Sequence, residues 1–153
     1  MTTRRGEAYR SFFQRLIDEL RERHNFTNAR VSLPRNFYHF ASGDAPRVYY
    51  DAFFNADGRA VASVLIRRDR EESRRLFDWL ERDRAKIESE FGAKLNWSKP
   101  DDVRACSIST SRPGSIEDER ATLQDIHLWF TDNLLNLKKV FGPRLLAYNS
   151  AKP

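Results

Sequence analysis

The chain has 153 residues, with 27 Lys and Arg against 22 Asp and Glu, so its formal net charge is +5. This length suits one domain with its own core, and 11 Phe, 5 Tyr and 3 Trp exclude wholesale disorder. A single cysteine excludes an internal disulfide and a multi-cysteine zinc site. Without a long apolar run or a signal-like start, we expect a cytoplasmic protein with no membrane segment.

The first predicted element is a helix over residues 7–24, because aromatic and aliphatic side chains recur there on one helical face. The residues of this stripe are Tyr9, Phe12, Phe13, Leu16, Ile17 and Leu20. Asn25 is expected to end the helix, since asparagine tolerates the left-handed backbone conformation.

Three strands are predicted next. A short aromatic strand lies within residues 36–43, and the segments 47–55 and 60–67 are rich in aromatic and aliphatic residues. The sequence Asn-Ala-Asp-Gly at 55–58 separates the last two strands and is typical of a tight hairpin.

A second helix is predicted over residues 69–91. Asp69 is placed to cap its first turn, with Glu72 completing a capping box, and Gly92 provides a glycine stop. Residues 94–98 and 103–112 are then expected to form a second pair of strands.

The last predicted element is a long helix that starts after a capping box of Ser115 and Asp118. Gly142–Pro143 is expected to terminate it, because proline does not continue a helix. Its inward stripe is Leu123, Ile126, Phe130, Leu134, Leu137 and Phe141.

Short connections between neighbouring strands favour antiparallel pairing, and the helices must cover a face of the sheet. We therefore expect an α+β fold in which an antiparallel sheet of two hairpins plus a short strand packs in two layers against three helices. Residues 1–153 are expected to form a single domain, with an ordered core over about 7–146 and a flexible tail over about 148–153.

The usual motifs of cofactor chemistry are absent from the sequence. His24, His39 and His127 lack the spacing of a helical zinc pair, and the strand after Asp51 has neither the carboxylate nor the lysine that a restriction-type nuclease needs. We therefore expect no cofactor, no metal site and no catalytic residues of a self-contained nuclease, and we expect Cys106 to be a small buried thiol.

The excess of positive charge lies in the first half of the sequence, because residues 1–75 hold 15 basic and 10 acidic side chains and residues 76–153 hold 12 of each. Arginines alternate with aromatic residues in this half. Guanidinium groups neutralise phosphates and aromatic rings stack on bases. The predicted nucleic-acid-binding residues are Arg30, Arg35, Tyr38, His39, Arg47, Tyr49, Phe53, Arg59 and Arg67.

The same residues also have more ordinary interpretations. Aromatic residues that alternate along a strand commonly pack under helices. The arginines between residues 67 and 75 are interspersed with Asp69, Glu71 and Glu72, which favours a solvated, ion-paired helix start.

Several segments of the chain resemble the bacterial and archaeal domain of unknown function family numbered 4268. These segments are 9–13, 26–30, 36–43, 90–92, 112–118 and 141–143, and the similarity extends from about Tyr9 to Leu145. Members of the family are often the C-terminal part of longer proteins whose N-terminal part looks like a restriction-type nuclease. The resemblance implies a nucleic-acid-related or defence-related context, and it carries no catalytic residues.

The leading hypothesis is a non-catalytic binding module that recognises DNA or RNA, or supports a nuclease partner, through an aromatic and arginine-bearing sheet surface. A second hypothesis is a protein-interaction or homodimerisation module, for which Trp79, Trp97 and Trp129 are the expected anchors. A third is an enzyme or small-ligand pocket around His39, Arg47 and Asp51.

Overall fold

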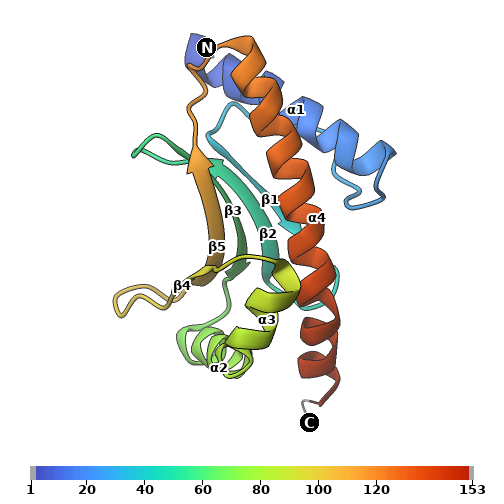
Figure 1. Cartoon of the computed structure of the whole chain (residues 1–153), viewed down its shortest axis with the longest axis vertical. Coiled ribbons are helices and arrows are strands. Elements are labelled where there is room, and N and C mark those ends of the chain that lie inside the picture. Colours follow the sequence, from blue (N-terminus) through green and yellow to red (C-terminus); the bar gives the residue numbers. More distant parts are fainter. Residues whose placement is uncertain (1–2, 152–153) are drawn as a thin grey trace. The chain divides into compact units, whose positions relative to one another are not determined.

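The computed structural model describes residues 3–151, which form four helices and five strands (Figure 1). In chain order the elements are α1 Arg4–Glu22, β1 Phe37–Ala41, β2 Val48–Phe54, β3 Arg59–Ile66, α2 Arg70–Glu81, α3 Arg84–Phe91, β4 Asn96–Ser98, β5 Cys106–Pro113 and α4 Arg120–Ala151. The strands make one antiparallel sheet in the order β1-β2-β3-β5-β4. The predicted α+β class and the two strand pairs are therefore confirmed.

The chain divides into two compact units. Unit 1 consists of residues 1–40, 51–62 and 111–135. Unit 2 consists of residues 41–50, 63–110 and 136–153. Helix α4 and the strands β1, β2, β3 and β5 each contribute residues to both units.

The core of unit 1 is a cluster of four phenylalanines. In Figure 1, α1 and the first half of α4 lie over the same strands. Phe12 and Phe13 of α1, Phe54 of β2 and Phe130 of α4 meet there, with ring centroids 5.1–6.4 Å apart. Since each ring is buried, this cluster carries much of the hydrophobic stabilisation of the unit.

The end of α1 has the geometry that the sequence predicts. Asn25 takes a φ of 50°, and the next N–H, that of Phe26, donates to the Leu20 carbonyl at 2.9 Å. This hydrogen bond, which spans six residues, satisfies a carbonyl of the last helical turn. The left-handed conformation expected of Asn25 is confirmed, whereas the helix itself ends earlier than predicted, at Glu22 with Arg23 as its C-cap.

The segment between α1 and β1 is held along α1 by side chains of that helix. The Gln14 amide donates to the Arg30 carbonyl at 2.7 Å and accepts from the Ser32 N–H at 2.9 Å. The Ser32 hydroxyl donates to the Arg10 carbonyl at 2.6 Å, and Arg21 donates to the Ala29 carbonyl at 2.8 Å. These bonds fix the path of the chain into β1.

In unit 2, the side chains of α2, α3 and the second half of α4 pack with β4. The Trp97 ring lies 5.9 Å from that of Phe77 and 6.5 Å from that of Phe141. The Asn136 side chain donates to the Phe91 carbonyl at 2.8 Å, which ties α4 to the end of α3.

The expectation of one helix over residues 69–91 is wrong, because two helices occupy that segment. Asp69 caps α2 as predicted, accepting from the Glu72 N–H at 2.9 Å. The chain then tightens at Asp83, whose N–H donates to the Leu80 carbonyl three residues back at 3.0 Å. The spacing from Leu80 to Ile87 places both on one face of a continuous helix, so the periodicity gives no sign of the break.

The expectation that Gly142–Pro143 ends the last helix is also wrong, because α4 contains Pro143 and continues to Ala151. Proline removes the N–H that would bond to the Lys139 carbonyl. The buried residues on both sides of it, Phe141 and Leu145, offset that local cost by packing. Residues 148–151 of the predicted tail therefore lie in α4, and 152–153 fall outside the described residues.

Replacing Phe54 with alanine is expected to lower the free energy of unfolding by about 3–5 kcal/mol, because it removes a ring from the centre of the phenylalanine cluster. Phe53→Ala, one position away on the other face of β2, is the matched control and is expected to cost about 1 kcal/mol. Urea unfolding followed by circular dichroism measures both. Equal losses in the two variants would contradict the assignment of the core.

Replacing Pro143 with alanine is expected to raise the free energy of unfolding by about 2 kcal/mol. Removing the proline from the helix interior stabilises the folded state by about 3 kcal/mol. The unfolded chain becomes more flexible without the proline, and this entropy offsets up to about 1 kcal/mol of that stabilisation. Thermal and urea unfolding measure the change, with Pro113→Ala, outside any helix, as the control. Destabilisation by Pro143→Ala would mean that the proline itself makes a favourable contact.

Candidate nucleic-acid interface

The side chains of β2 alternate between a buried face and a second, partly exposed face. Phe54 and Ala52 are buried, whereas Phe53 is half-buried. Phe54 packs in the phenylalanine cluster, so Phe53 and Asp51 project from the other side of the sheet.

Strand β1 lies beside β2 in an antiparallel register. The Phe54 N–H donates to the Asn36 carbonyl at 2.9 Å, which places Phe37 opposite Phe53 and His39 opposite Asp51. The Phe37 and His39 rings lie 4.6 Å apart with an interplanar angle of 33°. We call the surface formed by Phe37, His39, Asp51, Phe53 and Arg59 the aromatic face; all but Asp51 are half-buried.

Two arginines lie at the aromatic face. The Arg35 guanidinium is 5.9 Å from the centre of the Phe37 ring, and the Arg59 Nε donates to the Ser111 hydroxyl at 2.9 Å. Within residues 3–151, neither arginine forms an ion pair. Their charges are therefore not neutralised by a neighbouring carboxylate.

A groove of about 460 Å³ extends from this face towards the start of α1. Its lining includes Arg35 and Phe37 and, from α1, Arg5 and Tyr9. The Arg5 Nε donates to the Tyr9 hydroxyl at 3.3 Å, and this bond raises the pKa of the guanidinium. The groove thus continues the combination of arginine and aromatic side chains.

His39 and Asp51 form the strongest polar contact of the aromatic face. The His39 Nδ1 and the Asp51 Oδ1 are 2.6 Å apart, and the Asp51 side chain is only 8% exposed. The contact is a hydrogen bond from the imidazole to a carboxylate oxygen when the hydrogen of the ring is on Nδ1. The contact fixes the orientation of the imidazole ring next to Phe37.

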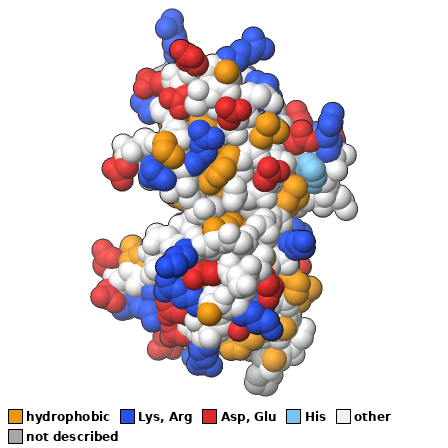
Figure 2. Space-filling view, in the orientation of Figure 1, with side chains coloured by type: hydrophobic (Ala, Val, Ile, Leu, Met, Phe, Trp, Pro, Cys, Tyr) orange, Lys and Arg blue, Asp and Glu red, His pale blue; other side chains and the backbone are white. Residues whose placement is uncertain are grey.

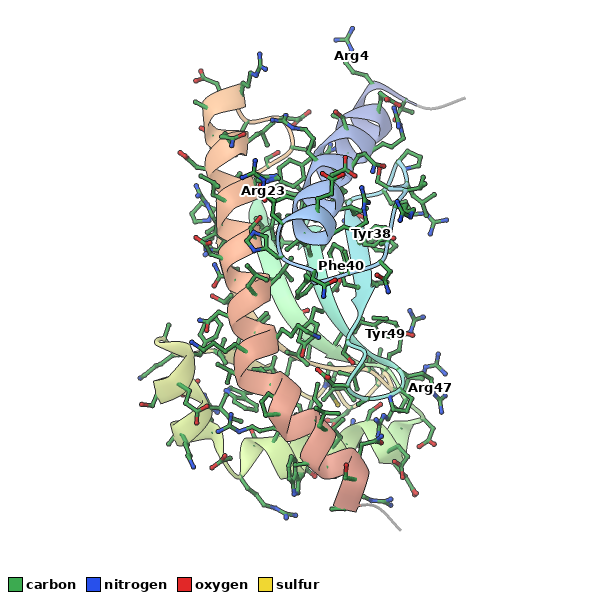
Figure 3. The ribbon with its side chains drawn as sticks, turned by 90° about the vertical axis from the view of Figure 1, so that its right-hand side faces the viewer. Arg4, Arg23, Tyr38, Phe40, Arg47 and Tyr49 are labelled. Atoms are coloured by element: carbon green, nitrogen blue, oxygen red, sulfur yellow. The ribbon has the colours of Figure 1, made fainter. Side chains whose placement is uncertain are left out.

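The two other predicted residues of unit 1 lie away from the aromatic face. Tyr38 points to the opposite side of β1, where its ring lies 4.8 Å from that of Phe40 (Figure 3). Arg30 is exposed on the segment held along α1 by Gln14. The structure thus brings together Arg35, His39, Phe53 and Arg59 of the predicted set.

The remaining predicted residues, Arg47, Tyr49 and Arg67, belong to unit 2. The Arg67 N–H donates to the Arg47 carbonyl at 3.0 Å, so these two arginines are neighbours, one just before β2 and the other just after β3. Both are exposed and Tyr49 is half-buried. They make a second, smaller basic surface in their own unit.

The fold redistributes the charge that the sequence places in its first half. Unit 1 contains 11 basic and 11 acidic residues and has a formal charge of zero, whereas unit 2 contains 16 basic and 11 acidic residues and holds the whole +5. Figure 2 shows Lys and Arg interspersed with Asp and Glu over the visible surface. Any attraction of unit 1 for an anion must therefore come from local, unpaired arginines.

The basic cluster at the start of α2 is partly ion-paired, as the more ordinary interpretation predicts. Glu72 lies 2.8 Å from Arg75 and 3.9 Å from Arg68. Arg68 is buried and donates to the Pro46 carbonyl at 3.0 Å. Glu72, in the first turn of α2, interacts favourably with the helix dipole and partly neutralises these arginines.

The three tryptophans are all half-buried. Trp97 packs in the core of unit 2, and the Trp79 ring lies 5.1 Å from that of Tyr148. In unit 1, the Trp129 ring lies 5.3 Å from that of Phe130, next to Leu128, which is 51% exposed. Trp129 and Leu128 are thus the more suitable residues for a protein contact.

Cys106 is buried and unpaired, as predicted. Burial raises the pKa of its thiol, so the thiol stays protonated and weakly reactive. Across residues 3–151 there is no group of three or more His, Cys, Asp or Glu side chains placed to hold a metal ion. In the same stretch, none of the helices has the length and apolarity to cross a bilayer.

Sequence reasoning missed a pocket in unit 1 that is lined by Arg15 and His127, among others. These residues come from α1 and α4, which are distant in the sequence. No local motif brings them together, so only the packing of the two helices places them side by side.

The fold and this surface define an α+β domain. One face of its sheet packs in the helix-covered core, and the opposite face has aromatic and arginine side chains. Residues 8–145 match the family described as "Domain of unknown function (DUF4268)". The chain belongs to this family, which confirms the resemblance and its extent. Neither the curated proteins nor the solved structures contain a match.

In the folded chain, the His39 Nδ1 is expected to carry a hydrogen, because it lies 2.6 Å from the Asp51 carboxylate oxygen. Long-range nitrogen–proton NMR correlations of the imidazole ring measure this. Asp51→Asn is expected to change the His39 ring signals and to leave those of His24, at the end of α1, unchanged. A His39 ring protonated only on Nε2 in the native chain would contradict the contact.

Proposed function

We propose that the protein is a non-catalytic module that binds single-stranded nucleic acid on the aromatic face of unit 1. The observation that carries this proposal is the pair of neighbouring, mutually tilted rings, Phe37 and His39, with the Arg35 guanidinium over Phe37. Bases stack on such rings, and an adjacent guanidinium binds the phosphate that follows.

The partial exposure of the rings supports a single strand as the ligand. Phe37, His39 and Phe53 are half-buried, so part of each ring is exposed to an unpaired base. Stacking on aromatic rings is tolerant of sequence, because every base has a flat face. The aromatic face is therefore expected to bind with little sequence preference.

The arginines support binding to the backbone of the strand. Arg35 and Arg59 form no ion pair within residues 3–151, so a phosphate can approach them without displacing a carboxylate. Asp51, the acidic residue of the aromatic face, is buried and accepts from His39. The local field at the surface is thus set by the arginines.

We further propose that the module works with a nuclease in a defence system of the cytoplasm. This context comes from family resemblance, since similar domains often follow a restriction-nuclease-like part. A separate nuclease or a nuclease domain of the same assembly is then the expected protein partner, and the module supplies nucleic-acid binding to it.

A second candidate function is protein interaction or homodimerisation through unit 1. Val31 is 70% and Leu33 48% exposed on the segment held along α1, and Leu128 is 51% exposed beside Trp129 on α4. Exposed apolar side chains of this size suit a protein contact. Sedimentation of the native chain and of Leu128→Asp tests it, and a monomer in both would argue against a dimer.

The third hypothesis is a pocket around His39, Arg47 and Asp51, of which His39 and Asp51 are in direct contact. Arg47 belongs to unit 2, and neither His39 nor Asp51 lines the three pockets described in residues 3–151. A histidine oriented by a carboxylate is able to act as a general base, so the pair keeps this hypothesis open.

Phe37→Ala is expected to weaken binding of fluorescein-labelled poly(dT) and poly(rU) by about 1–3 kcal/mol, because it removes the stacking platform. Phe53→Ala removes the neighbouring ring of the aromatic face, and this variant is expected to remain folded. Arg35→Ala is expected to reduce the slope of log affinity against log salt by about 0.7, the value for one phosphate contact to a single strand. Fluorescence anisotropy at several salt concentrations measures all three variants.

Arg23→Ala is the matched charge control, because Arg23 lies at the far end of α1 and pairs with Glu19. It is expected to bind as the native chain does. The proposal fails if the native chain does not bind either strand at low salt, or if the Phe37 and Arg35 variants bind as tightly as the control.

A further inference from the structure

We propose that unit 1 contains a second binding site, a pocket between α1 and α4 that takes a phosphate monoester group. The pocket has a volume of about 280 Å³. Its lining comprises Ala8, Ser11, Phe12, Arg15, Ile116, Arg120, Leu123, Gln124 and His127. We call it the arginine pocket. It shares no residue with the aromatic face, so binding at the arginine pocket and binding at the aromatic face can be tested separately.

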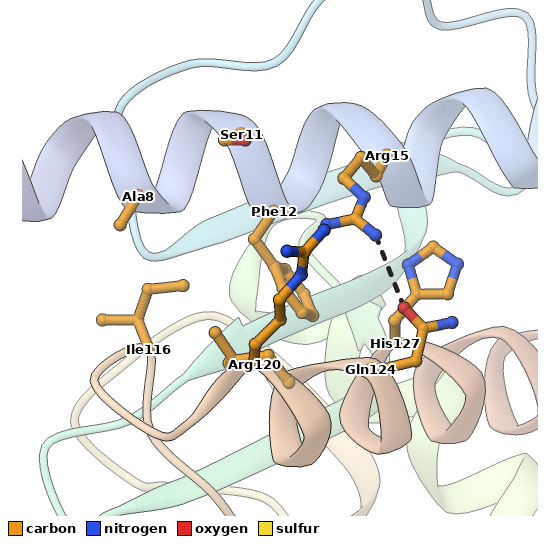
Figure 4. A pocket seen from close by; sticks show the side chains of 9 residues that line it. Ala8, Ser11, Phe12, Arg15, Ile116, Arg120, Gln124 and His127 are labelled. Carbon is orange, nitrogen blue, oxygen red and sulfur yellow. Dashed lines mark hydrogen bonds between the residues drawn. The ribbon is translucent and has the colours of Figure 1, made fainter.

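Two guanidinium groups face the interior of the arginine pocket. Arg15 reaches in from α1 and Arg120 from the first turn of α4, and their charged ends turn towards each other (Figure 4). The Arg15 Nη2 donates to the Gln124 Oε1 at 3.4 Å, while the Arg120 side chain forms no hydrogen bond with any other residue of the described range 3–151. Neither forms an ion pair within the part of the chain that the structure describes.

This arrangement favours the binding of an anion. The two positively charged guanidinium groups repel each other, and a negative group between them removes that repulsion. Two planar guanidinium forks suit the several oxygens of a doubly charged phosphate better than the two oxygens of one carboxylate. Glu19 of α1, which acts electrostatically on His127 of the pocket, already interacts with Arg23 and His24 at 3.5 and 3.6 Å.

The rest of the pocket is apolar or neutral. Phe12 and Ile116 are buried at its base, and the His127 ring lies 6.3 Å from that of Phe12. Burial lowers the pKa of His127, and Arg15 lowers it further against the opposing effect of Glu19. A neutral histidine and two apolar side chains suit a flat ring attached to the phosphate.

The phosphate monoester therefore belongs to a small ring-bearing molecule or to the 5′ end of a nucleic-acid strand, which share this chemistry. Isothermal titration of the native chain with phenyl phosphate is expected to give saturable binding with a Kd on the order of 1 mM or below. Phenol and benzoate are the neutral and carboxylate comparisons and are expected to bind at least about tenfold more weakly. Competition by a 5′-phosphorylated but not a 5′-hydroxyl oligonucleotide would identify the strand end as a source.

Arg15→Ala and Arg120→Ala are each expected to weaken phenyl phosphate binding about tenfold or more, the effect of one charged hydrogen-bonding partner. Arg4→Ala is the matched control, because Arg4 is exposed on the same helix and outside the pocket (Figure 3). Arginine side-chain NMR signals of Arg15 and Arg120 are expected to shift on titration. Both arginines are exposed, so their replacement is expected to leave the fold intact, and circular dichroism checks this. A loss of binding in either variant then reports on the site rather than on folding.

Three results would overturn the proposal: no saturable binding of phenyl phosphate, equal binding of benzoate, or equal losses in Arg4→Ala and the two pocket variants. Phe37→Ala separates this site from the aromatic face, because it is expected to leave phenyl phosphate binding unchanged. A loss of nucleic-acid binding in Phe37→Ala with intact phosphate binding supports both sites.

Discussion

The alternation of side chains between the two faces of β2 is the constraint on which the rest of unit 1 depends. Because neighbouring side chains point to opposite faces of a sheet, Phe54 joins the phenylalanine cluster under α1 and α4 while Phe53 is left on the other side. A shift of one residue in register would exchange the two faces. The same alternation thus produces both the hydrophobic core and the surface that we propose as the binding site.

Elements whose signals are local could be predicted from the sequence. The stripe of α1, the turn at Asn25 and the cap at Asp69 each depend on a few neighbouring residues, and the structure contains all three. The helix end predicted at Pro143 is wrong, because the burial of Phe141 and Leu145 on either side outweighs the free-energy cost of a proline inside the helix. Packing overrode a strong local preference there.

The candidate sites divide in the same way. The alternation on β2 indicated that Phe53 and Asp51 lie away from the core, which the burial of Ala52 and Phe54 supports. The hydrogen bond from His39 to Asp51 and the meeting of Arg15 with Arg120 depend on how separate elements pack, and sequence spacing does not encode this. Counting charge along the sequence also failed, because unit 1 recruits residues 111–135, which add more acidic than basic side chains.

The Gln14 amide has a consequence for the chemical ageing of the protein. Its nitrogen donates to the Arg30 carbonyl and to the Asp18 carboxylate, while its oxygen accepts from the Ser32 N–H. Deamidation would replace the donor with a second acceptor, which would then repel the Arg30 carbonyl and Asp18. A loss of one amide group on α1 would therefore loosen the segment that leads to Arg35, while the phenylalanine core stayed intact.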